Sequence, residues 1–261
     1  MGTMNNDILE EVADYLRYRT ECGERTVELE PETVSLLRAA PRGNGAVTPS
    51  RAAAAAAPAA PLPAVPKETP APAADSLAAI ASECAACRAC GLCAQRKQAV
   101  PGQGRADHPD ILFVGEAPGA DEDEQGLAFV GRAGQLLTKM IAAMGYSREE
   151  VFIANICKCR PPANRTPTPE EMAACLPFLK RQIALIGPKY IVALGNTAIL
   201  GLLGKSGIMR LHGVWQSFEG IPLMPTFHPA YLLRLPAAKR DCWKDLQLVM
   251  AKLGKPLPAQ A

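Results

Sequence analysis

Residues 111–119 read Ile-Leu-Phe-Val-Gly-Glu-Ala-Pro-Gly, and their pattern is the clearest indication of the fold. Four apolar residues followed at once by a glycine-containing turn are typical of a buried strand that leads into a helix. Similar apolar runs lie at residues 151–154, 190–194 and 223–227. Helical periodicity is found at residues 133–144, 169–186, 197–203 and 239–253.

Strands that alternate with helices indicate a parallel sheet with helices on both faces. We therefore expect an α/β fold, a three-layer α/β/α sandwich with a four-stranded, mainly parallel central sheet. Ligands of such sheets bind beyond the carboxyl ends of the strands. Functional side chains are thus expected directly after the apolar runs.

The composition divides the chain into three parts. A short amphipathic helix is expected near residues 6–19, within an N-terminal segment at 1–38. Residues 39–75 are rich in Ala and Pro, which predicts a flexible linker. The globular domain is then expected over residues 76–261. The N-terminal segment is interpreted either as a docking segment for a protein partner or as a dispensable tail.

Charge and hydropathy bear on partners and location. Residues 1–75 hold 7 basic and 11 acidic residues, and residues 76–261 hold 21 basic and 15 acidic ones. The basic excess favours a polyanionic partner, although a solvated surface explains it equally well. No apolar run reaches the roughly eighteen residues of a membrane span, and residues 1–11 do not resemble a secretory signal. We expect a soluble, cytoplasmic monomer that binds no membrane.

Nine cysteines are present, and seven of them gather in two stretches. Cytoplasmic thiols stay reduced, so clustered cysteines more often bind metal than form disulfides. The first stretch repeats a cysteine at every third position, at Cys84, Cys87, Cys90 and Cys93. Such a ladder is compatible with zinc or with an iron–sulfur cluster.

Polar motifs follow three of the four apolar runs. Gly115–Gly119 and the acidic residues 121–124 follow the first, Asn155 and Lys158–Pro162 end the second, and His228–Arg234 follow the fourth. Each motif alone is a weak signal. A tight strand-to-helix turn needs glycine in any case, an acidic run is ordinarily solvated, and a single histidine is more often structural than catalytic.

Together these segments resemble the family 4 uracil-DNA glycosylases over roughly residues 87–253. The matching motifs are Gly115–Gly119, Phe129–Gly131, Ala133–Leu137, Asn155, Lys158–Pro162, Asn164–Arg165 and His228–Arg234. The resemblance implies a monofunctional DNA-repair hydrolase that flips uracil out of single- or double-stranded DNA. The enzyme would cut the N-glycosidic bond and leave an abasic site for base excision repair.

The resemblance also implies one [4Fe-4S] cluster held by four cysteines. Cys87, Cys90, Cys159 and Cys175 match the ligands of that family. Thiolates on separated segments suit such a cluster, because it cross-links distant parts of the chain. The regular ladder leaves open whether Cys84 or Cys93 replaces one of these ligands.

Further residues match the uracil pocket of the family. Phe129 would stack on the flipped base, and Asn155 would read its N3–H and O4. His228 would donate a hydrogen bond to O2, where negative charge develops. Ala117 would lie in the same pocket, at a position where the best-known uracil glycosylase family has an aspartate.

The group that acts on the water is left open between two carboxylates. Glu116 or Glu122 would orient the water or stabilise the cationic sugar, and Glu122 is alternatively placed against C5 to exclude thymine. In the last motif, the resemblance places Leu232 as the wedge that enters the DNA helix and Arg234 on a phosphate. The other interpretation of Leu232 is a core residue.

Two other classes of protein compete with the enzyme. One is a uracil-DNA capture protein without turnover, but the Arg/His-rich insertion of that subgroup is not visible in the sequence. The other is a cysteine-ligated redox or zinc module, which leaves Asn155, His228 and Gly115–Gly119 without a role. An absorbance spectrum separates a cluster from zinc, and a uracil excision assay separates turnover from capture.

Overall fold

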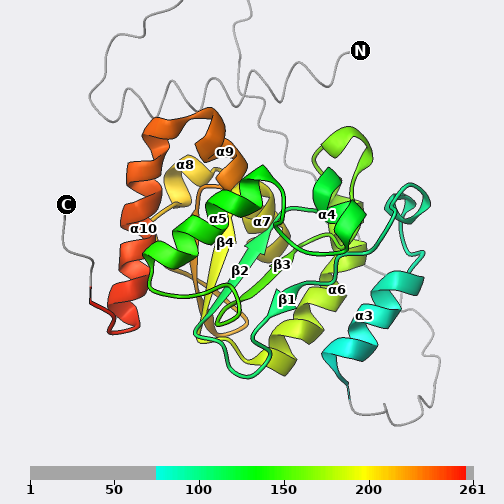
Figure 1. Cartoon of the computed structure of the whole chain (residues 1–261), viewed down its shortest axis with the longest axis horizontal. Helices are drawn as coiled ribbons and strands as arrows, with labels where there is room; N and C mark the ends of the chain where they lie inside the picture. Colours follow the sequence, from blue (N-terminus) through cyan, green and yellow to red (C-terminus); the bar gives the residue numbers. More distant parts are fainter. Residues whose placement is uncertain (1–74, 257–261) are drawn as a thin grey trace, which may run out of the picture. The chain divides into compact units, whose positions relative to one another are not determined.

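The central sheet has six strands in the order β1-β3-β2-β4-β6-β5 (Figure 1). The structure is a computed structural model that describes residues 75–256. The inner strands β3, β2, β4 and β6 run parallel, and the two edge strands are antiparallel to their neighbours. The strands are β1 (Gln103–Gly104), β2 (Ile111–Gly115), β3 (Phe152–Asn155), β4 (Tyr190–Leu194), β5 (Gln216–Phe218) and β6 (Ile221–Thr226).

The predicted α/β sandwich is confirmed, but the predicted number of strands is wrong. The four expected strands are the parallel inner ones. The edge strands β1 and β5 have only two and three residues, too few for an apolar run or a period of two to be recognised. β5 joins β6 through Glu219 and Gly220, both with positive φ, as a tight two-residue hairpin requires.

Helices cover both faces of this sheet (Figure 1). Three short 3-10 segments lie at Gly91–Ala94, Pro162–Asn164 and Pro236–Ala238. The α-helices are α3 (Leu77–Ala86), α4 (Ala120–Gln125), α5 (Arg132–Ala143), α6 (Pro169–Ile186), α7 (Gly195–Leu203), α8 (Ile208–Leu211), α9 (Pro229–Arg234) and α10 (Lys239–Lys252).

The alternation of side chains along β2 builds two separate cores. Ile111 and Phe113 point to one face and belong to the core that includes residues of α5, α9 and α10. Leu112 and Val114 point to the other face, into the core that includes residues of α6 and α7. Because all four side chains are fully buried, β2 is the centre of the sandwich.

The ends of α6 follow from its sequence. Thr168 caps the first turn and forms a capping box with Glu171, and Pro169 occupies the first helical position. Gly187 ends the helix in the left-handed conformation that glycine adopts most easily. These signals explain why the predicted range 169–186 matches the helix.

The strand order brings the motifs together. β2 lies between β3 and β4, so the chain moves to one side of β2 and then crosses to the other. Such a reversal opens a crevice at the carboxyl ends of the strands, where ligands of α/β sheets bind. The segments after β2, β3 and β6 all start at this edge.

Residues 73–261 form one compact unit. The helix predicted near residues 6–19 and almost all of the predicted linker at 39–75 lie outside the described residues. Within residues 75–256, no helix is both long enough and apolar enough to cross a membrane.

Candidate active site and cysteine site

Three residues, Gly115, Phe129 and Asn155, come together where β2 and β3 end. Gly115 is paired in register with Asn155 across the two strands. A Cβ built on Gly115 would lie 2.4 Å from Oδ1 of Asn155 and 2.4 Å from Cζ of Phe129. A larger residue at position 115 would displace one of these side chains, so the glycine is required by close packing at the site.

Asn155 carries a buried acceptor at this point. Its side chain is 2% exposed, and within the described part of the chain its Oδ1 has no hydrogen-bond donor. A buried polar atom without a partner costs about 1–3 kcal/mol, so such atoms are rare in native structures. Oδ1 therefore marks a place where a donor from a ligand would be bound.

Phe129 is held in a strained backbone conformation beside Asn155. Its φ of 53° lies in the left-handed region that is unusual for an aromatic residue. Gly134 permits this turn, because a Cβ there would lie 1.9 Å from the carbonyl oxygen of Phe129. The ring of Phe129 lies 5.6 Å from that of His228, centroid to centroid.

The two carboxylates expected at the site have different surroundings. Glu122 accepts backbone N–H groups from Gly119, Val130 and Gly131, at 3.1, 2.9 and 2.9 Å. Its two oxygens thereby tie the first motif to the Phe129 loop. Glu116 directly follows β2, and its Oε2 accepts a hydrogen bond of 2.6 Å from Oγ1 of Thr197. Ala117 is partly buried beside it.

His228 follows β6 and caps α9. Its Nδ1 accepts a hydrogen bond from the backbone N–H of Ala230 at 3.2 Å, so the ring proton of the neutral imidazole is on Nε2. Burial and the nearby Arg234 lower the pKa of His228 to about 4. The residue is therefore a neutral hydrogen-bond donor at physiological pH.

Helix α9 bears on the expected DNA wedge. Leu232 is 1% exposed and lies in the core, which favours the other interpretation of Leu232, as a core residue. The next residue, Leu233, is 38% exposed. Because an α-helix has 3.6 residues per turn, one step along α9 changes the side chain from core to surface. Arg234 is exposed, as are Lys239 and Arg240 further along the chain.

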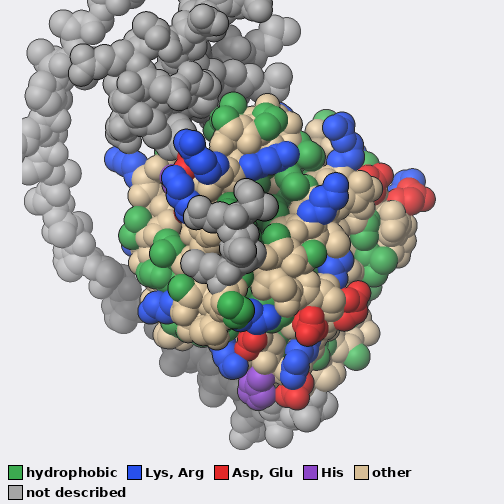
Figure 2. All heavy atoms as spheres, turned by 60° about the vertical axis from the view of Figure 1, so that its left-hand side comes forward, with side chains coloured by type: hydrophobic (Ala, Val, Ile, Leu, Met, Phe, Trp, Pro, Cys, Tyr) green, Lys and Arg blue, Asp and Glu red, His purple; other side chains and the backbone are tan. Residues whose placement is uncertain are grey.

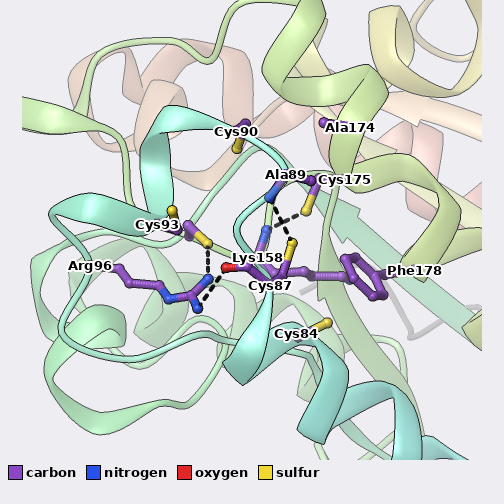
Figure 3. A pocket seen from close by; sticks show the side chains of 11 residues that line it. Cys84, Cys87, Ala89, Cys90, Cys93, Arg96, Lys158, Ala174, Cys175 and Phe178 are labelled. Atoms are coloured by element: carbon purple, nitrogen blue, oxygen red, sulfur yellow. Dashed lines mark hydrogen bonds between the residues drawn. The ribbon is translucent and has the colours of Figure 1, made fainter.

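Six cysteines surround a hollow beside the core that includes residues of α6 and α7 (Figure 3). All four expected ligands line it, from three segments: the turn after α3, the residues after β3, and α6. Two further members of the ladder line it as well. The cysteines are Cys84, Cys87, Cys90, Cys93, Cys159 and Cys175. The hollow therefore brings together residues up to 91 positions apart in sequence.

Donors and cations surround these sulfur atoms. Arg96 Nη1 donates to Sγ of Cys159 at 2.9 Å, and the backbone N–H of Lys158 donates to Sγ of Cys175 at 3.1 Å. A hydrogen bond from Cys157, together with the Lys158 ammonium group, lowers the pKa of Cys175. Burial instead raises the pKa of Cys84 to about 12. These surroundings stabilise a thiolate at Cys175.

No role was predicted from sequence for Lys158, although it opens the motif Lys158–Pro162, and Thr197 was not expected at the site. Lys158 is 1% exposed, and its Nζ donates to the carbonyl oxygen of Asn155 at 3.0 Å and to Oε1 of Gln182 at 2.7 Å. The only available signal for Lys158 was its place between Asn155 and Cys159. Thr197 lies in a stretch without any recognised motif.

Comparison with known proteins agrees with this geometry. Residues 101–247 match the model of the uracil DNA glycosylase superfamily. The chain is 51% identical over 144 residues to the type-4 uracil-DNA glycosylase of Thermotoga maritima, a match that covers 53% of this chain and 73% of that protein.

Two archaeal proteins with the same name give similar results. The type-4 uracil-DNA glycosylase of Pyrobaculum aerophilum is 44% identical over 162 residues, with 59% of this chain and 82% of that protein covered. That of Archaeoglobus fulgidus is 42% identical over 168 residues, with 61% and 84% covered. The chain therefore belongs to the uracil DNA glycosylase superfamily and, within it, to the type-4 uracil-DNA glycosylases.

Proposed function

We propose that this protein removes uracil from DNA by flipping the nucleotide out of the strand and hydrolysing its N-glycosidic bond. The product is an abasic site in an otherwise intact strand. The observation that carries the proposal is the buried Oδ1 of Asn155, an acceptor that has no donor among the described residues. It lies beside an aromatic ring and a neutral histidine.

The base would be recognised by Asn155 and Phe129. Uracil N3–H supplies the donor that Oδ1 lacks, and the Asn155 amide nitrogen would donate to O4. Cytosine has an unprotonated N3 and an amino group at position 4, so both contacts would be mismatched. Stacking on Phe129 would contribute about 1–3 kcal/mol. Ala117 would line the same pocket.

His228 would stabilise the departing base. Bond cleavage leaves negative charge on the uracil and positive character on the sugar. The Nε2–H of a neutral imidazole can donate to O2 as this charge develops, without the ring first taking up a second proton. The Ala230 N–H bond to Nδ1 supports this role, because it keeps the proton on Nε2.

Between the two carboxylates, we assign the reacting side to Glu116. Glu122 accepts three backbone N–H groups, so moving it toward the substrate would leave buried donors without a partner. We therefore give Glu122 the role of holding the Phe129 loop. Glu116 follows β2 at the edge where Asn155 ends β3, and it would orient the attacking water or stabilise the cationic sugar.

The surface around α9 would bind the DNA. Flipping a nucleotide costs a few kcal/mol and leaves a gap in the stack. Leu233 is the exposed leucine of the pair and would fill this gap. Arg234, Lys239 and Arg240 are exposed nearby and would contact phosphates. Figure 2 shows Lys and Arg side chains distributed over the face where α9 and α10 lie.

The cysteine site would hold an iron–sulfur cluster, although the cysteines of residues 75–256 do not lie in an arrangement already set to bind a metal ion. Four thiolates from three segments suit a [4Fe-4S] cluster, and Arg96 and Lys158 offset the negative charge of the sulfurs. We assign the ligands to Cys87, Cys90, Cys159 and Cys175. When bound, the cluster supplies a cross-link between these segments.

The cellular location, the oligomeric state and the partners of the protein can be proposed as well. Free cysteines that hold a cluster require a reducing compartment, and we place the protein in the cytoplasm. We propose that it acts as a monomer on single- or double-stranded DNA. Residues 1–38 would dock to a protein partner.

The decisive experiment is excision from an oligonucleotide with one uracil, followed by alkali. Strand cleavage in excess over the amount of enzyme is expected, because each abasic site breaks in alkali. A matched oligonucleotide with cytosine at the same position serves as the control. A stoichiometric protein–DNA adduct would support capture, and the absence of either product would contradict the proposal.

A further inference from the structure

The first turn of α7, directly after β4, touches two parts of the proposed active site. Gly195 has a φ of 86°, and a Cβ built on it would lie 2.9 Å from Cβ of His228. Two residues later, Oγ1 of Thr197 donates to Oε2 of Glu116 at 2.6 Å. One turn therefore contacts both the carboxylate and the histidine that are assigned to bond cleavage.

Thr197 is held in a well-packed position. It is 7% exposed and lies in the first turns of α7, which contacts β2, β4 and β6. Ala198, Ile199 and Leu202 are buried on the same helix. Because threonine is branched at Cβ, its side chain also has few rotamers. The hydroxyl group is thus presented to Glu116 from a fixed point.

The acceptor of the Thr197 hydroxyl differs from the usual one in a helix. A threonine inside a helix commonly bonds its hydroxyl to a carbonyl of the preceding turn. Thr197 instead donates to a carboxylate 81 positions away in sequence. Short O–H···O bonds to a carboxylate are among the stronger hydrogen bonds in proteins. This bond restricts the rotation of the Glu116 carboxylate by holding its Oε2.

We infer that Thr197 is a positioning residue for uracil excision, which acts by orienting the Glu116 carboxylate. Gly195 complements it, because the absent side chain lets His228 approach the same turn. The inference rests on the proposed function and deepens it. Thr197 would affect the rate of bond cleavage, whereas binding of the DNA would depend on α9 and on the base pocket.

The test compares Thr197→Val with Thr197→Ser in the full chain with its cluster. Valine keeps the shape and loses the donor, and serine keeps the donor. We expect Thr197→Val to lower the single-turnover excision rate roughly ten-fold, the size of effect typical for one hydrogen bond to a charged group. Binding of a uracil oligonucleotide should stay within about two-fold, and Thr197→Ser should recover most of the rate.

A control is Ser82→Ala, which removes an exposed hydroxyl bonded to the Ala78 carbonyl within its own helix α3 and should leave the rate unchanged. A wild-type rate in Thr197→Val, or equal losses in the valine and serine variants, would overturn the inference. If Thr197→Val does not fold, a slow Thr197→Ala beside a fast Thr197→Ser supports it, and equal rates in those two refute it. Failure of the wild-type enzyme to excise uracil would instead refute the proposed function.

Discussion

The uracil pocket and the cysteine site use opposite electrostatics. At the proposed pocket, the groups assigned to the base are a neutral histidine and an amide oxygen that lacks a donor among the described residues, and the Glu116 carboxylate is assigned to the side of the sugar and the water. Around the cysteines, the Arg96 guanidinium and the backbone N–H of Lys158 donate to sulfur atoms, and the charge of the Lys158 ammonium group lowers the pKa of Cys175. The first arrangement is suited to a neutral ligand with its own donors, and the second to a strongly anionic one.

The two regions are joined by one short segment. Lys158 donates from Nζ to the carbonyl of Asn155 and from its backbone N–H to Cys175. Only Ile156 and Cys157 separate Asn155 from Lys158, and both are fully buried. Asn155, the proposed base reader, is thus anchored to the wall of the cysteine site. A substitution that disrupts the cysteine site should therefore also lower uracil excision. A substitution in the pocket should leave the chromophore of the cysteine site unchanged.

The largest effect is expected at the cysteine site. Cys159→Ser or Cys175→Ser should bleach the brown chromophore and lower the melting temperature by roughly 10 °C or more, because a lost metal site removes folding energy directly. Absorbance and a thermal melt measure both. Uracil excision should fall as well, through the link to Asn155.

Cys242→Ser is the matched control, since Cys242 is buried in the opposite core. It should keep the chromophore. Cys84→Ser and Cys93→Ser test the other members of the ladder. If these two variants lose the cluster while Cys159→Ser retains it, the assignment of the four ligands is wrong.

His228→Leu should give the next largest effect. Removing one donor to a developing anion typically lowers the rate by about 10²–10³-fold. A single-turnover assay measures this loss, and the exposed His108 provides the control variant His108→Leu. The chromophore should be unchanged in both. An unaltered rate in His228→Leu would remove the histidine from the mechanism.

His228 also predicts a pH dependence of stability. The unfolded histidine binds a proton near pH 6.5, whereas the folded one does so only near pH 4. Its contribution is therefore complete above pH 6.5 and is lost as the pH falls to about 4, by up to about 3 kcal/mol. Denaturant unfolding across this range should show a weaker pH dependence in His228→Leu than in the wild type.

Asn155→Asp tests the base reader. A protonated carboxyl group could donate to cytosine N3 and accept from its amino group, and each mismatched buried polar group costs about 1–3 kcal/mol. Uracil excision should therefore fall about 10- to 100-fold, and some cytosine excision should appear, strongest at acidic pH. Single-stranded oligonucleotides that differ only in the target base measure both. Wild-type specificity in both Asn155→Asp and Asn155→Ala would contradict the assignment.

Much of the fold could be predicted from sequence because its inner elements have strong apolar patterns. The four parallel strands and α5, α6, α7 and α10 were expected close to their observed bounds. The helices α8 and α9 have four and six residues, too few for a period of 3.6 to stand out, and α4 is mostly acidic. An acidic run is ordinarily solvated, but Glu122, which was expected at the active site, and Asp123 are both buried.

The candidate site was predictable where it depends on strand ends. Gly115, Asn155 and His228 each follow a recognised apolar run, so the topology alone places them at one edge of the sheet. The bonds of Glu122 and Thr197 depend on tertiary packing, which local sequence does not encode. The choice between Leu232 and Leu233 depends on the rotation of a six-residue helix and could not be made in advance.

Leu233→Ala and Leu232→Ala separate the surface of α9 from its core. Leu233→Ala should slow excision from double-stranded DNA more than from single-stranded DNA, because an unpaired base leaves no gap to fill. Leu232→Ala should instead lower the free energy of unfolding by about 2–5 kcal/mol. If Leu233→Ala affects both substrates equally, the wedge lies elsewhere.

The smallest effect is expected from removing the N-terminal part, and the structure sharpens where to cut. Asp75 was counted with the linker, but its carboxylate accepts two hydrogen bonds from the Arg181 guanidinium, which also pairs with Glu83 on α3. This ion pair fastens α3, which carries Cys84, to α6, which carries Cys175.

Deleting residues 1–74 should therefore leave uracil excision and the chromophore nearly unchanged, since every recognised motif lies beyond the cut. Deleting residue 75 as well should only slightly lower the thermal stability, because exposed ion pairs contribute little, and the loss should shrink further at high salt. Melting curves of the two truncations at low and high salt measure this difference. A folded 75–261 fragment without uracil excision would show that the N-terminal part belongs to the enzyme.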